Sequence, residues 1–292
     1  MMKKTLLLVT VGLLVLAATT FAQDYAGVDK CKMCHMQEYR EWSKTAHAED
    51  FSSVGEGDSA RDLYTYAGGR CLACHVVGYG EEGGYDPEKP HTEQEELLRI
   101  QCESCHGPGA EHVASGGRKP TVVAVPDSRA TCNACHTTSF KAMPVAAVGD
   151  KDVARGPHHP QSLMLNGVGG YEYAGKRYPK SPHAWVVADQ CVTCHMNPEE
   201  PHSLEADLDS CRICHGFSLE DFNVAGAQTE IEELLHELEG YLENAADQES
   251  IEYLRANYNF HLVEADASHG VHNFFYARQL LMDSIANKPK QK

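Results

Sequence analysis

One short pattern constrains this chain more than any other feature, because the pentapeptide Cys-x-x-Cys-His occurs six times in 292 residues. The copies begin at Cys31, Cys71, Cys102, Cys132, Cys191 and Cys211. Together they use all twelve cysteines of the chain. Two thiols at this spacing can each form a thioether with a vinyl group of a haem, and the histidine that follows then lies under the macrocycle as an iron ligand. We therefore predict one covalently attached haem c at every copy.

Two other kinds of site use closely spaced cysteines, namely zinc sites and redox-active disulfides. A zinc ribbon does not require a histidine directly after the second cysteine of each pair, and a dithiol oxidoreductase has no use for six identical couples. Six haems therefore remain the expectation, and the pattern assigns their residues. The thioether cysteines are Cys31, Cys34, Cys71, Cys74, Cys102, Cys105, Cys132, Cys135, Cys191, Cys194, Cys211 and Cys214, and the proximal ligands are His35, His75, His106, His136, His195 and His215.

The second axial ligand of each iron decides between two functions. An iron with histidine on both sides transfers electrons, whereas an iron without a distal ligand can bind a substrate. Eleven of the seventeen histidines are not proximal. Their local sequence context favours His47, His112, one of the tandem pair His158 and His159, His183, His202 and His272 as distal ligands. The sequence does not distinguish His158 from His159; His91 and His236 are interpreted as surface residues, and His261 and His269 are left open.

The fold class follows from the small amount of chain available to each cofactor. Removal of a signal peptide would leave roughly 45 residues per haem, too few for a separate apolar core around each one. We expect a mainly α protein with much irregular structure, little β structure and an interior made of haems. From residue 228 apolar residues recur at helical spacing, which predicts three C-terminal helices, near 228–242, 249–258 and from 270. The expected regions are a signal peptide (1–22), a hexahaem region (23–227) and a helical segment (228–292) packed on it.

The N-terminus and the charge indicate where the protein works. Lys3 and Lys4 precede an apolar run over residues 6–18 and a small-residue cleavage site after Ala22, as in a secretory signal peptide. The run is shorter than the roughly 20 residues of a membrane span, so we expect no transmembrane segment. The predicted protein is exported, to the periplasm or the cell exterior. A formal net charge of −17 argues against nucleic acid or an anionic membrane as partner and leaves redox proteins.

Two stretches carry a family resemblance. Cys31–His35 followed by Trp42 and Thr-Ala-His-Ala, and Cys-Glu-Ser-Cys-His-Gly-Pro-Gly-Ala-Glu-His ending at His112, resemble the tetrahaem cytochromes c of the nitrification pathway. This resemblance implies that His47 and His112 are distal ligands. The later part, with Cys-Val-Thr-Cys-His-Met at 191–196, His202, and Ser-His-Gly-Val-His-Asn at 268–273 ahead of a helix, is similar to the C-terminal half of cytochrome c nitrite reductases and hydroxylamine oxidoreductases. This similarity implies that His202 and His272 are distal ligands.

The middle of the chain, with Gly-Pro-His-His-Pro-Gln, resembles exported multihaem cytochromes of metal-respiring bacteria, some of which form extracellular filaments. We therefore expect a hexahaem electron-transfer cytochrome of anaerobic respiration, with assembly into a filament as an open option. The alternative is a reductase of nitrite, hydroxylamine or a sulfur oxyanion at one five-coordinate haem, with His261 or His269 placing protons. The Cys-x-x-Cys-Lys motif of the catalytic haem in such nitrite reductases is missing from the sequence, which weakens this alternative.

Overall fold

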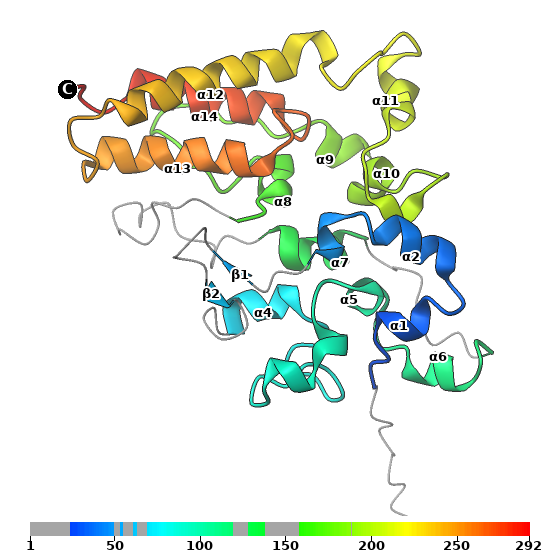
Figure 1. Ribbon diagram of the computed structural model, residues 1–292. Coiled ribbons are helices and arrows are strands. Elements are labelled where there is room, and N and C mark those ends of the chain that lie inside the picture. The colour runs from blue at the N-terminus through cyan, green and yellow to red at the C-terminus, as the bar shows by residue number, and fades with distance from the viewer. Residues whose placement is uncertain are drawn as a thin grey trace, which may run out of the picture.

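The computed structural model describes residues 24–49, 53–54, 61–62, 69–118, 128–137, 158–187 and 189–292. Within these ranges the protein is mainly helical, with short helices in the first two thirds and three long ones at the C-terminal end (Figure 1). One antiparallel pair, β1 (Ser53–Val54) with β2 (Arg61–Asp62), forms the sheet structure of the described part. The predicted mainly α fold with little β structure is confirmed.

Two predictions fall on other residues. The signal peptide predicted at 1–22 lies outside the described residues, and so does the run from Thr121 to Val125, whose sequence predicts a brief strand. Among the helices that the structure describes, none combines the length and the apolar character that a membrane span needs.

Each haem motif begins in, or at the end of, a short helix. These helices are α1 (Val28–Cys31), α4 (Gly69–His75), α5 (Cys102–His106), α7 (Ser128–His136), α10 (Cys191–His195) and α11 (Leu208–His215). In the first motif the helical turn continues past α1, because the N–H of His35 donates to the carbonyl of Cys31 at 3.0 Å. Residues three and four positions apart share one face of a helix. One turn therefore presents both cysteines and the histidine to the same side.

Further short elements connect these motifs. They are α2 (Met36–Trp42), η1 (Ala46–Ala48), η3 (His91–Glu93), η4 (Glu95–Leu97), α6 (Ala110–Ala114), α8 (Gln161–Asn166), α9 (His183–Val186), η7 (Pro201–Ser203) and η8 (Val224–Gly226). Thr92 and Glu95 have the spacing of a capping box ahead of Leu97, Leu98 and Ile100, which predicts one short helix leading to Cys102. This prediction is wrong. Gln94 interrupts such a helix with φ −139°, because its buried amide accepts from the N–H of Asp86 at 2.6 Å and donates back to the Asp86 carbonyl at 2.9 Å.

The C-terminal end consists of α12 (Ala227–Glu243), α13 (Ile251–Asp266) and α14 (Phe274–Ala286), which lie side by side (Figure 1). All three predicted helices are confirmed, although α13 continues eight residues beyond the predicted end at Tyr258 because Leu262 and Val263 are buried in the core. This core is an apolar cluster of twelve buried residues. Met164 of α8 belongs to it and is fully buried, so the cluster extends outside the three helices.

Buried polar side chains attach residues 169–180 to the same helices. Asn259 of α13 accepts from the N–H of Tyr171 at 2.7 Å and donates to its carbonyl at 3.0 Å, while the Tyr276 hydroxyl of α14 accepts from the N–H of Gly170 at 2.9 Å. Asn259 and Tyr276 are completely buried. An unpartnered polar group at such a depth costs about 1–3 kcal/mol, so these bonds fix the segment firmly. The C-terminal helices thereby hold the segment that connects His159 to His183.

Candidate haem-binding sites

Each proximal histidine lies beside an imidazole from a distant part of the chain. The ring centres are separated by 6.2 Å for His35 and His112, 6.4 Å for His75 and His158, 6.2 Å for His106 and His202, 6.0 Å for His136 and His47, 6.2 Å for His195 and His272, and 6.0 Å for His215 and His183. An imidazole nitrogen binds a first-row metal at about 2.0–2.1 Å and the ring centre lies roughly 1.2 Å behind it, so two imidazoles on opposite sides of one metal have centres about 6.3 Å apart. The six separations fit one iron between each pair of rings.

The ring-centre distances distinguish the two tandem histidines, His158 and His159. His158 is the residue beside His75, while the ring centre of His159 lies 3.9 Å from that of His158 and 5.5 Å from that of His136. The 5.5 Å separation is shorter than a shared iron requires, whereas His47, at 6.0 Å from His136, fits. Burial, followed by the neighbouring imidazoles His158 and His136, lowers the pKa of His159 to about 4. His159 is therefore a neutral imidazole between two ring pairs.

In four of the paired histidines, an oxygen atom lies within hydrogen-bond distance of Nδ1. Nδ1 lies 2.9 Å from Oε1 of Gln161 for His136, 3.0 Å from the carbonyl of Val271 for His183, 3.1 Å from the carbonyl of Leu204 for His195, and 2.7 Å from Oδ1 of Asp266 for His272. Each of these oxygens can only accept, so Nδ1 carries the proton and Nε2 keeps its lone pair. A metal-binding histidine is typically held in this way by its other nitrogen. The sequence did not single out any of these four acceptors.

The buried carboxylate of Glu41 in α2 connects the first motif to the 3₁₀ turn that carries His202. Its Oε2 accepts from the N–H of His202 at 3.1 Å and lies 3.7 Å from Nδ1 of the same residue. The indole of Trp42 donates to the carbonyl of Ile100 at 2.9 Å, just before the third motif. Residues about 160 positions apart are thus brought together beside His106. The sequence signal for this contact is weak, because a lone glutamate on a helix is usually solvated.

Sulfur atoms of different motifs also meet. The thiol of Cys31 lies close enough to that of Cys102 for each to shift the pKa of the other, and the same holds for Cys74 with Cys135 and for Cys132 with Cys191. Cys194 lies near Cys211, and the Cys194 carbonyl accepts from the N–H of Asp207 at 2.8 Å. The first motif is therefore next to the third, the fourth touches both the second and the fifth, and the fifth is next to the sixth.

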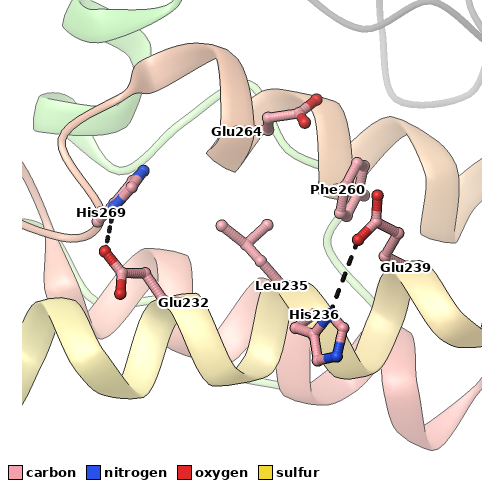
Figure 2. Close-up of a pocket in the computed structure, with 7 residues that line it drawn as sticks. All are labelled: Glu232, Leu235, His236, Glu239, Phe260, Glu264 and His269. Atoms are coloured by element: carbon pink, nitrogen blue, oxygen red, sulfur yellow. Dashed lines mark hydrogen bonds and ion pairs between the residues drawn. The ribbon is translucent and has the colours of Figure 1, made fainter.

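The two histidines left open by the sequence contact glutamates, His261 in α13 and His269 in the loop between α13 and α14, and so does His236 of α12. Figure 2 shows His269 against Glu232 and His236 against Glu239 at a pocket that Leu235 and Phe260 also line. The Nδ1–carboxylate distances are 2.7 Å for His269 and 3.9 Å for His236. His261 similarly lies 3.0 Å from Glu264. These contacts favour surface ion pairs over iron ligation for the three residues.

A family model matches the N-terminal part of the chain, and one curated protein matches about a third of it. Residues 30–107 fit the family model described as "Cytochrome c554 and c-prime". Cytochrome c-554 of Nitrosomonas europaea is 36% identical over 107 residues, which cover 32% of this chain and 43% of that protein. The matched region includes the first three motifs.

The structural comparisons extend over most of the chain. The outer cell wall cytochrome OcwA superposes with a TM-score of 0.57 at 22% identity, covering 86% of this chain and 50% of OcwA. An undecahaem cytochrome from the S-layer of Carboxydothermus ferrireducens gives 0.53 at 20% identity, with coverages of 82% and 42%. The chain thus spans half or less of the length of each of these proteins. The comparisons confirm the predicted resemblance to multihaem cytochromes c and support haem c binding.

Proposed function

We propose that this protein is a hexahaem electron-transfer cytochrome in which two histidines hold every iron. The proposal rests on six pairs of imidazole rings whose centres lie 6.0–6.4 Å apart. When bound, haem c supplies a one-electron ferric/ferrous couple at each site. In motif order, from Cys31 to Cys211, the distal ligands are His112, His158, His202, His47, His272 and His183.

The ligand pairs also explain how so short a chain is held together. His106 and His202 are far apart in the sequence, as are His75 and His158, so each shared iron would close a long loop. Cross-links that close long loops remove much of the conformational freedom of the unfolded chain. The histidines would therefore serve both electron transfer and folding.

We infer the order of the sites from the sulfur contacts. Cys31 meets Cys102, Cys105 lies near both Cys132 and Cys135, Cys132 meets Cys191, and Cys194 lies near Cys211. The path then runs through motifs one, three, four, five and six, with the second motif beside the fourth. The first motif and the sixth motif are the two ends of this path. These ends are where redox partners would exchange electrons.

The cellular setting is part of the same proposal. Histidine on both faces of an iron favours low reduction potentials, as anaerobic respiration requires. The two similar structures are described as an outer cell wall cytochrome and an S-layer cytochrome, which supports export of this chain to the periplasm or the cell exterior. The two ends of the path would also allow copies to join into a filament. Negative-stain images of the purified protein test that extension, and uniformly monomeric particles would end it.

Carbon monoxide distinguishes the electron-transfer function from the reductase alternative. It binds ferrous haem only where an axial position is open or labile, so the dithionite-reduced protein should show no spectral change on its addition. His112→Ala, which removes one distal ligand, is the positive control and should bind carbon monoxide at one haem. Carbon monoxide binding by the unmodified protein would instead favour a reductase with a five-coordinate haem.

A further inference from the structure

The loop between α13 and α14 places one of the proposed axial histidines, His272, against a buried carboxylate at the end of α13. Asp266 is the last residue of α13, and its side chain is 1% exposed. Its Oδ1 accepts a hydrogen bond from Nδ1 of His272 at 2.7 Å. His272 is in turn the partner of His195, the proximal histidine of the fifth motif.

The second carboxylate oxygen and the loop backbone are fixed as well. The Ser268 hydroxyl donates to Oδ2 of Asp266 and accepts from the N–H of His272, the latter at 3.2 Å. Gly270 has φ +97°, and a Cβ atom there would lie 2.9 Å from Ile231, so the turn requires glycine. With both oxygens accepting, Asp266 hydrogen-bonds as an ionised carboxylate does. These hydrogen bonds and the turn at Gly270 therefore fix the position of the Asp266 carboxylate.

Other axial histidines with a described Nδ1 bond have uncharged acceptors. His136 in the fourth motif contacts the amide oxygen of Gln161, and His183, the partner of the sixth motif, contacts the Val271 carbonyl. His195 itself contacts the Leu204 carbonyl. Within this set, His272 alone bonds to a carboxylate. The fifth motif therefore differs from its two neighbours on the path by one buried negative charge.

That charge acts on the iron through the imidazole. A carboxylate acceptor draws the Nδ1 proton toward itself and makes the ring a more basic ligand, which stabilises ferric over ferrous iron. Burial strengthens the effect because the local dielectric constant is low. We propose that Asp266 is a positioning residue that makes the fifth site lower in reduction potential than the fourth and sixth. This inference rests on the proposed function, since it requires His272 to be an iron ligand.

The test is a spectroelectrochemical titration of the haem-loaded protein and its Asp266→Asn variant. Asparagine keeps an accepting oxygen of the same shape but removes the charge, so one of the six one-electron steps should move to a higher potential while the other five stay in place. Glu232→Gln is the matched control, because Glu232 contacts His269, which is not an assigned ligand, at the same 2.7 Å. It should shift none of the steps.

A second variant carries the same chemistry to another site. Gln161→Glu places a carboxylate against Nδ1 of His136 and should lower one step, and it serves as the test if Asp266→Asn does not accumulate with all its haems. If Asp266→Asn, or Gln161→Glu in its place, keeps all haems low-spin and its potentials are unchanged, the role of Asp266 is wrong while the proposed function stands. High-spin iron in the unmodified protein would instead overturn the proposed function, so electron paramagnetic resonance separates the two failures.

Discussion

The two ends of this molecule obtain their interiors from different sources. Helices α12, α13 and α14 surround an apolar cluster of twelve buried residues, whereas in residues 24–118 the structure describes one such cluster, with five buried members around Val77. In the haem-motif region, which is the described part of residues 24–226, the α-helices are also short, between four and nine residues. Isolated helices of that length are unstable in water. We infer that packed apolar side chains stabilise the C-terminal helices, whereas the haem-motif region depends on its cofactors for stability.

The strongest way to break this comparison is to withhold haem. In protein produced without the haem-attachment machinery, we expect amide protection to be lost in residues 24–49, 69–118 and 128–137 and retained in α12–α14. The helical segment keeps its apolar core under these conditions, and the motif region loses the cross-links that hold it together. Hydrogen exchange read by mass spectrometry provides the measurement. Equal protection in both regions would show that the haem-motif region folds on its own side chains.

A core substitution tests the other half of the comparison. Leu280 of α14 is fully buried in the apolar cluster, so Leu280→Ala should lower the stability of the C-terminal helices by about 2–5 kcal/mol. Met282→Ala, at a position of the same helix that is 39% exposed, is the control and should change stability little. Denaturant unfolding followed by far-UV circular dichroism gives the free energy. Equal effects of the two variants would place the core elsewhere.

A polar substitution sharpens the comparison within the haem-motif region. The buried carboxylate of Glu103 accepts from the N–H groups of Ala26 at 2.9 Å, Gly27 at 2.8 Å and Gly109 at 2.6 Å. Glu103→Gln replaces one accepting oxygen with a donor and should cost about 1–3 kcal/mol of local stability. The expected readout is faster exchange at Ala26, Gly27 and Gly109 with α12–α14 unchanged. Unaltered exchange at those amides would refute the anchoring role of Glu103.

The smallest expected effect belongs to His159. Because its ring lies too close to that of His136 for both to bind one iron, His159→Ala should leave every haem low-spin. His47→Ala should convert one haem to high spin. Magnetic circular dichroism distinguishes the two outcomes. High-spin haem in His159→Ala together with low-spin haem in His47→Ala would transfer the ligand role from His47 to His159.

The sequence predicted features that depend on local spacing. Cys-x-x-Cys-His identified the proximal residues, and helical periodicity found the C-terminal helices, although α13 continues beyond its predicted end. Context also selected every histidine that the structure brings next to a proximal one. A histidine count and flanking turns were sufficient for this, because few histidines occur in rigid surroundings.

The pairing itself could not be predicted in this way. His47 meets His136 and His106 meets His202 across long separations, and spacing contains no information on such contacts. His158 and His159 are adjacent in the sequence and have nearly the same local context, but their side chains lie in different places. The choice between them therefore depends on the three-dimensional structure. Asp266 was missed because an aspartate at the end of a helix is ordinarily solvated. Its burial is apparent only once α13 and α14 have packed.

The central claim is most directly tested by the low-temperature electron paramagnetic resonance spectrum of the fully oxidised, haem-loaded protein, integrated against its haem content. The account predicts six haems per chain, all of them low-spin. A high-spin ferric signal that integrates to one haem or more, or a haem content below six, would contradict it.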